Sequence, residues 1–428
     1  MGSEREPIAV IGTGYVGLVT AAGFAQVGSE VFCVDVDADK IARLNRGEMP
    51  IWEPGLGQCV ARNRERLHFS TELAPALEHA RLLFVAVGTP PTYSGDADLS
   101  AVHAVVASMP ASDRHALVMK STVPVGTGAA IKRGFADQGK PGFAYVSCPE
   151  FLKEGSALED FLAPDRVVVG DDGDWAGDAV AELYAPLDSP LVRTDIASAE
   201  MVKLASNAFL ATKISFINEI ANVCEETGAD VAEVARGMGL DHRIGTHFLR
   251  PGIGFGGSCF PKDVSALKQL AGNSGYHFQL LTAVIEVNEL QKRRVIGKLQ
   301  KHLGSLVGTT IALLGLAFKA NTDDMREASS LVLAARLQAD GANVRAFDPI
   351  AEHEARKLLV GVDFASSALD ALEGADACIL VTEWPEFAGI DWAEVAERMR
   401  GRLVVDGRNF LDPDAVRAAG FLYEGVGR

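Results

Sequence analysis

Short apolar runs alternate with helix-like stretches along the first part of the chain. The runs are bounded by Gly, Pro, Asp or Thr, and they occupy residues 8–11, 31–34, 82–87, 116–119, 144–147 and 167–169. Runs that are apolar throughout are typical of parallel strands covered by helices on both faces. The pattern therefore predicts a doubly wound α/β domain over residues 1–195.

The pattern changes after residue 195. Residues 198–227 contain no Gly or Pro and predict one long helix that Gly228 can cap, and a second long helix is predicted from about residue 280 to 303. Further on, strand-like apolar runs return at residues 310–315, 343–347, 377–381 and 403–405. We predict a helical middle domain with a long central helix over residues 196–305, and a second, smaller α/β domain over residues 306–428.

Composition narrows the class of protein. The chain has 428 residues, 48% of them hydrophobic and 23% charged, as in a globular enzyme. The net charge of −17 argues against a nucleic-acid partner, because such a partner requires a positive field. Six scattered cysteines suggest a reducing compartment and predict no metal site. Without a signal-like pattern or an apolar run of membrane-spanning length, we expect a cytoplasmic protein with no membrane partner.

The first apolar run leads into a glycine pattern with a chemical meaning. Gly12, Gly14 and Gly17 form Gly-x-Gly-x-x-Gly between a predicted strand and a predicted helix, and Asp35 ends the second strand. The glycines allow a tight turn, a close approach to a pyrophosphate and close helix packing. Asp35 can accept hydrogen bonds from a ribose 2′-hydroxyl and would repel a 2′-phosphate. This Rossmann-like pattern predicts NAD as the cofactor.

A second glycine-rich segment carries a candidate nucleophile. In Gly256-Gly-Ser-Cys259-Phe-Pro-Lys262-Asp263 the glycines permit a sharp turn, and Cys259 is predicted to enter a helix. Exposed N–H groups and Lys262 would lower the thiol pKa, and Asp263 would lie one turn away. The alternative is that Cys259 is a small buried hydrophobe, as most free cysteines are.

Together these segments resemble the UDP-glucose/GDP-mannose dehydrogenase family, along essentially the whole chain. Besides the two glycine motifs, the resemblance includes Glu53-Pro-Gly-Leu, Val87-Gly-Thr-Pro, Lys120-Ser-Thr-Val-Pro-Val-Gly-Thr, Pro149-Glu-Phe-Leu-Lys-Glu-Gly, Lys203-Leu-Ala-Ser-Asn, Gly315-Leu-Ala-Phe-Lys, Asn321-Thr-Asp-Asp-Met-Arg-Glu and Asp406-Gly-Arg-Asn. The sequence from Phe248 to Asp263 is most similar to that of the family branch that oxidises UDP-glucose. Two small departures are Ala320, where Pro is common, and Cys148, where Asn is expected before Pro-Glu.

The resemblance implies a four-electron oxidation of a sugar alcohol to a carboxylate, with two NAD and one water. Cys259 would form a thiohemiacetal and then a thioester. Lys203 and Asn207, four residues apart on a helix, would stabilise the oxyanion. Asp263 and Thr122 would hold a water, and Glu150 would act as the base in hydrolysis.

The resemblance also implies binding residues. For the cofactor these are Gly12, Gly14, Tyr15, Val16, Gly17, Asp35, Lys40, Thr89, Thr122, Glu154, Lys262 and Arg326. For the nucleotide sugar they are Glu150, Phe151, Leu152, Lys203, Asn207, Arg243, Phe248, Leu249, Arg250, Gly256, Phe260, Phe318, Lys319 and Arg408. Lys319 and Arg408 would neutralise the phosphates locally, and Arg243 would reach a neighbouring subunit in a homodimer.

Three alternatives remain open at this stage. The substrate can be another nucleotide sugar, such as GDP-mannose or a UDP-N-acetylhexosamine. The reaction can be a two-electron oxidation without a covalent step, which would survive the substitution Cys259→Ser. The protein can also be a non-catalytic NAD-binding sensor, although the joint presence of Cys259, Lys203, Asn207 and Asp263 argues against that class.

Overall fold

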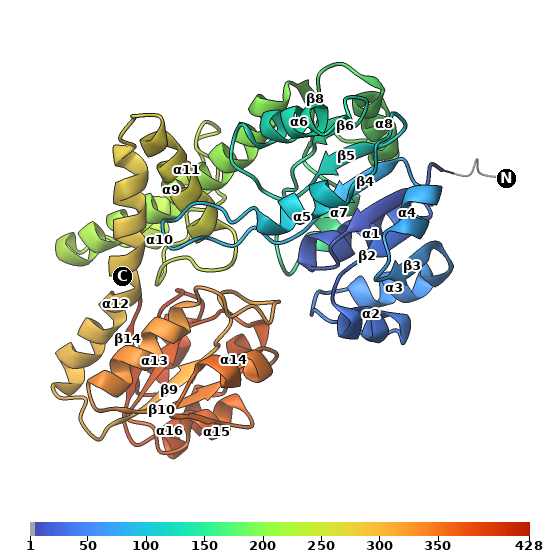
Figure 1. The fold of residues 1–428 in the computed structure, drawn as a ribbon. Helices are drawn as coiled ribbons and strands as arrows, with labels where there is room; N and C mark the ends of the chain where they lie inside the picture. The colour runs from blue at the N-terminus through green and yellow to red at the C-terminus, as the bar shows by residue number, and fades with distance from the viewer. Residues whose placement is uncertain (1–4) are drawn as a thin grey trace. The chain divides into compact units, whose positions relative to one another are not determined.

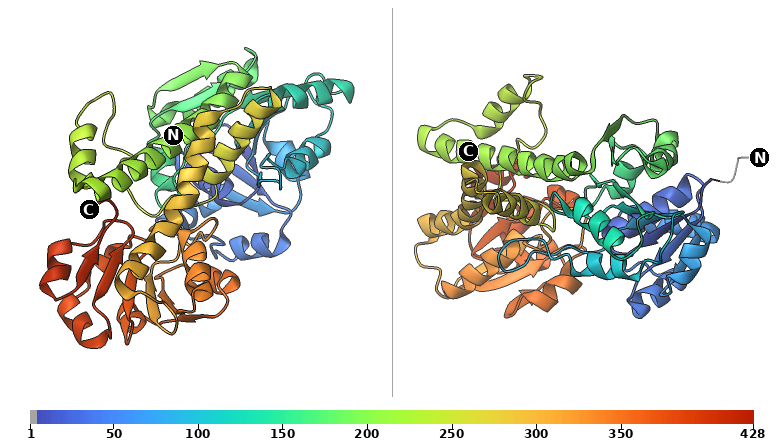
Figure 2. Two further views of the ribbon diagram at one scale, coloured as in Figure 1. Left: turned by 90° about the vertical axis from the view of Figure 1, so that its left-hand side faces the viewer. Right: turned by 45° about the horizontal axis from the view of Figure 1, so that its top comes forward.

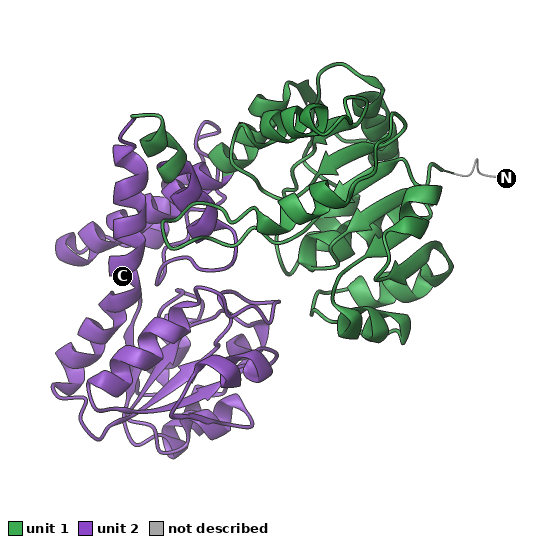
Figure 3. Cartoon of the chain, viewed as in Figure 1, with its two compact units in different colours: residues 1–206, 269–275 green, residues 207–268, 276–428 purple. Residues whose placement is uncertain are grey.

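The computed structural model describes residues 5–428 (Figure 1). Its contacts divide the chain into two compact units, shown in Figure 3. The first unit contains the chain up to Ser206 together with Gln269–Gly275, and the second contains Asn207–Lys268 and Tyr276–Arg428. The division falls within one long helix, α9 (Ile196–Thr227).

The first unit contains an eight-stranded sheet in the order β3-β2-β1-β4-β5-β6-β7-β8. The strands are β1 (Ile8–Ile11), β2 (Val31–Val34), β3 (Leu67–Ser70), β4 (Leu82–Val85), β5 (Ala116–Met119), β6 (Ala144–Ser147), β7 (Val167–Gly170) and β8 (Leu191–Thr194). Neighbouring strands are parallel except β6 and β7, which pair antiparallel at Ser147 and Gly170. The pattern predicted parallel strands, and this one pair is the exception to it.

Helices cover both faces of this sheet (Figures 1 and 2). They are α1 (Tyr15–Gln26), α2 (Ala38–Asn45), α3 (Leu56–Arg62), α4 (Ala74–His79), α5 (Ser100–Ser108), α6 (Thr127–Asp137), α7 (Ala157–Leu162) and α8 (Trp175–Tyr184), with short 3-10 turns at Arg64–Arg66 and Ala185–Leu187. In β1, Ile8 and Val10 belong to one hydrophobic core, whereas Ala9 and Ile11 belong to the other. The strand is apolar at every position because both of its faces are buried.

The second unit joins helices to a smaller sheet. After α9 come α10 (Val231–Gly239), α11 (Phe260–Asn273) and α12 (Gln279–Leu303), and α12 forms one long unbroken helix in Figure 2. The six strands are parallel in the order β11-β10-β9-β12-β13-β14. Their bounds are β9 (Thr310–Leu314), β10 (Asn343–Phe347), β11 (Val362–Phe364), β12 (Ala377–Leu380), β13 (Leu403–Asp406) and β14 (Leu422–Glu424).

This second sheet is also buried on both faces. Its helices are α13 (Ser329–Ala339), α14 (Glu352–Leu358), α15 (Ala368–Leu372), α16 (Trp392–Arg398) and α17 (Pro413–Ala418), with a 3-10 turn at Pro385–Gly389. Along β9, Ile311 and Leu313 face one core, and Ala312 and Leu314 face the other. The fold class predicted from the sequence, two Rossmann-like α/β parts and a helical middle region with a long helix, is therefore confirmed.

The two long helices begin and end close to where the pattern placed them. The first begins two residues earlier than predicted, at Ile196, and Gly228 follows it with φ of 76°. Gly304 follows the second helix with φ of 69°. Both glycines have the positive φ that favours Gly at a helix end. No helix within residues 5–428 has the length and apolar character needed to cross a lipid bilayer.

Candidate active site

The turn between β1 and α1 has room only for glycine at two of its three glycine positions. Gly12 has φ of 97°, and a Cβ atom there would lie 2.5 Å from the carbonyl oxygen of Ala86. A Cβ atom on Gly17 would lie 1.8 Å from the carbonyl oxygen of Gly12. In front of Gly14, which precedes α1, nothing lies within 4 Å of a Cβ position. The turn is thus tightly packed at Gly12 and Gly17 and open at Gly14, as a pyrophosphate site at a helix N-terminus requires.

Asp35 lies immediately after β2 with both carboxylate oxygens engaged. Its Oδ2 accepts hydrogen bonds of 2.7 Å from the backbone N–H and from the hydroxyl of Thr13, and one of 3.0 Å from Lys40 Nζ. Its Oδ1 accepts one of 3.0 Å from Asp37 N–H. Burial alone would raise the pKa of Asp35, but these hydrogen bonds lower it to about 2. The carboxylate is therefore charged and fixed at the end of β2, and Lys40 lies against it.

Tyr15 is held by a carboxylate that the sequence analysis treated only as part of a motif. Its hydroxyl donates to Glu53 Oε2, and that oxygen also accepts a 2.7 Å hydrogen bond from Gly155 N–H. Glu53 Oε1 accepts one of 2.7 Å from Ala157 N–H at the start of α7. Glu53, which is buried, therefore ties the α1 turn to the segment that follows Glu150. Glu154 lies in a turn before α7, and no helix joins it to Glu150.

Thr89 and Thr122 lie together at the carboxyl end of the first sheet. The Thr89 hydroxyl donates a 2.9 Å hydrogen bond to the carbonyl oxygen of Thr122. The segment after Thr122 leads into α6, whose first N–H groups have no side-chain cap of their own. Glu200 of α9 caps these groups instead, because its carboxylate accepts hydrogen bonds of 2.7 Å and 2.8 Å from the backbone N–H groups of Gly126 and Gly128. Glu200 was not predicted from the sequence.

Glu150 forms a buried ion pair with Lys203 in the first unit. Glu150 Oε1 lies 2.9 Å from Lys203 Nζ, and Oε2 accepts a 2.6 Å hydrogen bond from Leu152 N–H. Both side chains are about 95% buried, with exposures of 5% and 4%. Burial would raise the pKa of Glu150, but Lys203 and the Leu152 N–H outweigh it and lower that pKa. The carboxylate is therefore ionised and available to accept a proton.

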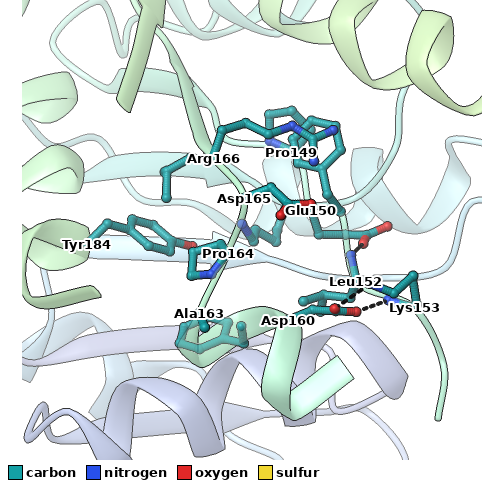
Figure 4. A pocket seen from close by; sticks show the side chains of 14 residues that line it. Pro149, Glu150, Leu152, Lys153, Asp160, Ala163, Pro164, Asp165, Arg166 and Tyr184 are labelled. Atoms are coloured by element: carbon teal, nitrogen blue, oxygen red, sulfur yellow. Dashed lines mark hydrogen bonds and ion pairs between the residues drawn. The ribbon is translucent and has the colours of Figure 1, made fainter. Parts of the chain in front are cut away.

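The segment around Glu150 also lines a small cavity of about 90 Å³ within the first unit. Figure 4 shows Glu150, Arg166 and Tyr184 among the side chains around it. The Arg166 guanidinium lies over the Phe151 ring, 3.6 Å from its centroid, and Lys203 lies 5.4 Å from the same centroid. The neighbouring Leu152 packs against the hydrophobic core.

In the second unit, Cys259 immediately precedes α11. Its carbonyl oxygen accepts a 2.8 Å hydrogen bond from Asp263 N–H, so Cys259 occupies the position before the first helical turn. The Ser258 hydroxyl lies 3.5 Å from Cys259 Sγ. Cys259 is partly exposed, whereas the other five cysteines are buried. The buried-hydrophobe interpretation therefore fits those five better than it fits Cys259.

Asp263 lies one turn beyond Cys259 and is almost fully buried. Its Oδ2 accepts a 2.6 Å hydrogen bond from Asn207 Nδ2, and its Oδ1 lies 2.7 Å from Lys262 Nζ. The predicted residues Asn207, Lys262 and Asp263 therefore form one polar cluster at the start of α11.

Buried amides hold the glycine-rich segment that leads to Cys259. Asn288 of α12 donates a hydrogen bond of 3.0 Å to the Phe255 carbonyl oxygen and accepts one of 2.8 Å from the Phe255 N–H. Asn218 of α9 accepts a hydrogen bond of 2.8 Å from the Gly252 N–H. A Cβ atom on Gly256 would lie 2.2 Å from the carbonyl oxygen of Glu327. The two amides were missed, although a polar residue at a buried position of a long helix is a detectable signal.

The residues predicted to bind the sugar nucleotide differ in what their side chains contact. Phe248 has φ of 64°, a conformation that non-glycine residues rarely adopt and that clusters at functional sites. Phe260 packs edge-on against the Phe255 ring and tilts against Phe248, with centroids 5.8 Å and 6.1 Å away. Leu249 packs in the hydrophobic core with Ile217, so its side chain serves packing.

The predicted cations are held in different ways. Arg408 donates hydrogen bonds of 2.8 Å to the Val381 carbonyl and 3.1 Å to the Gly254 carbonyl. Lys319 lies over the Phe318 ring, 5.5 Å from its centroid. The other three are exposed: Arg250 near Asn409 and Phe410, Arg243 paired with Asp241, and Arg326 paired with Asp324. Arg408 is thus an anchor between two segments of the second unit.

Comparison with known proteins decides the family. Family models of the UDP-glucose/GDP-mannose dehydrogenases match three successive stretches: the NAD-binding domain over residues 6–188, the central domain over 197–290 and the UDP-binding domain over 312–413. The chain belongs to the UDP-glucose/GDP-mannose dehydrogenase family. It is therefore an oxidoreductase that uses NAD, and the open turn at Gly14 with Asp35 beyond it fits that cofactor.

Several members of this family are similar over their full length. The UDP-glucose 6-dehydrogenase of Pseudomonas aeruginosa is 47% identical over 441 aligned residues, covering 98% of this chain and 97% of that protein. TuaD of Bacillus subtilis, also a UDP-glucose 6-dehydrogenase, is 46% identical, covering 98% and 93%. The solved structure of a UDP-glucose dehydrogenase from Pyrobaculum islandicum is 39% identical with a TM-score of 0.92, covering 100% of this dehydrogenase and 98% of that chain.

Proposed function

We propose that this dehydrogenase oxidises UDP-glucose at C6 to UDP-glucuronate. The observation that carries the proposal is Cys259, a partly exposed thiol at the start of α11 with a buried, hydrogen-bonded Asp263 one turn away. Relatives that are 40–47% identical are UDP-glucose 6-dehydrogenases. A solved UDP-D-ManNAc dehydrogenase of Pyrococcus horikoshii is less similar, at 28% identity, which favours glucose over an N-acetylated sugar.

The first two steps convert the alcohol into a thioester. NAD, when bound, supplies the acceptor for the hydride that leaves C6 in each oxidation. After the first, Cys259 Sγ attacks the aldehyde carbon and forms a C–S bond, giving a thiohemiacetal. Lys203 and Asn207 stabilise the oxygen of that adduct through N–H donors. Loss of the second hydride and of the hydroxyl proton leaves a thioester on Cys259.

Hydrolysis then releases the product. Asp263 and Thr122 hold a water, and Glu150, which is ionised beside Lys203, accepts a proton as the water attacks the thioester carbon. The C–S bond breaks, and the thiolate of Cys259 leaves. The balance is one alcohol, two NAD and one water in, and one carboxylate, two NADH and three protons out.

Binding residues are proposed on the same basis. Phe151, Leu152, Phe248, Leu249, Arg250, Gly256, Phe260, Phe318, Lys319 and Arg408 would form the sugar-nucleotide site, with Leu249 contributing through its backbone and Arg408 through the segments it joins. Tyr15, Val16, Lys40, Thr89, Glu154, Lys262 and Arg326 would contact the cofactor. We also propose the three-part division at residues 195 and 305, which agrees broadly with the ranges of the family models.

The decisive experiment measures NADH released per UDP-glucose consumed. We expect two NADH per carboxylate in the natural enzyme, and no carboxylate from Cys259→Ala. Cys224→Ala is the matched control, since Cys224 is buried in α9, and it should keep the ratio of two. One NADH per sugar, with activity surviving Cys259→Ser, would support a two-electron reaction without a covalent step. NAD binding without turnover of any nucleotide sugar would support a sensor.

Substrate choice is tested by comparing kcat/KM for UDP-glucose, GDP-mannose and UDP-N-acetylmannosamine. The proposal requires UDP-glucose to be the best substrate, and it fails if another of these sugars is turned over far faster.

We also propose that the enzyme is a homodimer in the cytoplasm. Phe209, Phe216 and Val223 of α9 are spaced by seven residues, or about two helical turns, and all three are exposed. Such a stripe of large apolar side chains is typical of a helix that packs against a partner. Arg243, exposed beside Asp241, would then reach the site of the neighbouring subunit. The six free cysteines agree with a reducing compartment.

A further inference from the structure

Lys120 is a buried cation that no carboxylate neutralises directly. The residue is 5% exposed. Its ammonium contacts Cys148 Sγ at 3.7 Å and faces the Tyr184 ring, with 5.2 Å to the ring centroid. Within residues 5–428, no Asp or Glu forms an ion pair with it. Burial of a charge without such a partner is costly, and an apolar side chain would fill this space at a lower cost in free energy.

The topology places Lys120 beside the catalytic segment. Met119 and Ser147 are register partners at the ends of the parallel strands β5 and β6, and Lys120 and Cys148 are the residues that follow them. Both therefore lie at the carboxyl edge of the sheet, where α/β proteins bind their ligands. Glu150 is two residues beyond Cys148, and Lys120 and Glu150 line the same cavity of about 90 Å³.

We propose that Lys120 is a positioning residue for thioester hydrolysis, because its charge keeps Glu150 in the carboxylate form that accepts the proton from water. The inference rests on the proposed function and deepens it. Lys203 forms the direct ion pair with Glu150, whereas Lys120 lines the same cavity as Glu150 without an ion pair to it. Cys148 and Tyr184 hold the Lys120 side chain in place without neutralising it. Cys148 is also where the chain departs from the Asn expected before Pro-Glu.

The other charged groups around Glu150 determine how strong this effect is. Arg166, with Asp165 beside it, faces Glu150 from the segment before β7. Lys153 and Asp160 pair with each other on the wall of the cavity. Burial raises the pKa of Glu150, and Lys203, the Leu152 N–H and Lys120 lower it. Removal of the Lys120 charge therefore raises the pKa of Glu150. As the pH falls, Glu150 is then protonated, and no longer acts as a base, at a higher pH than in the natural enzyme.

The test is the pH profile of Lys120→Met, a neutral side chain of similar length. The acid limb of kcat should move up by about half to one pH unit, so that activity falls roughly three- to tenfold below that limb and recovers above it. Above the limb, where hydrolysis is not slowed, the KM for UDP-glucose should change less than twofold. At acidic pH, intact-protein mass spectrometry should find more sugar adduct on Cys259, because hydrolysis is slowed. Lys120→Arg should restore the natural limb.

Two controls separate this role from a structural one. Lys298→Met removes a lysine that is 12% exposed and pairs with Glu225 and Glu424, and it should lower Tm without moving the limb. Lys120→Gln gives a second neutral side chain, and it tests the proposal if the Met variant folds poorly. An unmoved acid limb in folded Lys120→Met or Lys120→Gln overturns the inference while two NADH per sugar still uphold the proposed function. A natural enzyme that releases no second NADH overturns the function itself.

Discussion

At the scale of single residues, Asp35 allows a sharp prediction of how stability depends on pH. Its pKa of about 2 lies below the ordinary value near 3.9, so the ionised group stabilises the fold above pH 4 and loses this contribution as pH falls toward 2. Because the side chain is only 9% exposed, we expect Asp35→Asn to lower the free energy of unfolding by about 2 kcal/mol. Urea denaturation should give the same difference at every pH from 5 to 8. A difference that changes within that range would contradict this assignment.

The residues that the sequence predicted and those that it did not differ in the span of their contacts. Gly12, Asp35, Cys259 and Asp263 were predicted because each lies in a short motif whose spacing has a chemical meaning. The structural role of Glu53 was not predicted, because its hydrogen-bond partner Ala157 lies 104 residues further along the chain. The polar partners of the glycine-rich segment likewise come from separate helices. Such contacts depend on the tertiary fold, which no local pattern specifies.

At the scale of elements, the glycine-rich segment before α11 should tolerate no added methyl group. Gly256→Ala would place Cβ 2.2 Å from a backbone oxygen, so either this segment or the one around Glu327 must shift. We expect a loss of stability of about 1–3 kcal/mol and a large loss of kcat, because Cys259 moves with the segment. Urea unfolding and steady-state rates measure both effects.

The matched control for Gly256→Ala lies within a helix. Gly297 is in the interior of α12, and nothing lies within 4 Å of a Cβ atom there. Gly297→Ala should therefore raise stability by about 0.5–1 kcal/mol with kcat unchanged, because alanine is the better helix former. If both variants lost activity equally, the close contact at Gly256 would not be the cause.

The strands that were missed all lie at the edges of the two sheets. They are β3, β8, β11 and β14, the first and last strand of each sheet. The central strands β1, β4 and β5 are apolar and buried at every position, because both faces and both edges of these strands are covered, and this gives a clear signal. In β8, three of the four residues are exposed, and β11 has only three residues. An edge strand is identified by pairing with its neighbour, so its own sequence carries little evidence for it.

At the scale of the whole molecule, the order of α/β, helical and α/β segments could be predicted because each has its own periodicity. The compact units follow a different boundary, within α9 between Ser206 and Asn207. A continuous helical pattern gives no sign of such a boundary, because the hydrogen bonds of a helix continue across it. The proposed catalytic pair Lys203 and Asn207 is on this same helix, with one residue on each side. The sequence therefore predicted the pair, but not the division between the two residues.

The apolar stripe on α9 gives the last prediction, which concerns assembly. Phe209 and Phe216 are 66% and 49% exposed, and burial of such a side chain is worth about 2 kcal/mol. Light scattering should therefore give about twice the chain mass of 45.4 kDa for the natural enzyme, and a mass near 45.4 kDa for Phe209→Glu/Phe216→Glu. Val360→Glu is the control, since Val360 is exposed in a loop away from α9, and it should leave the mass doubled. A double variant that keeps the doubled mass would place the interface elsewhere, because two buried carboxylates facing a symmetric partner could not be accommodated there without a large loss of affinity.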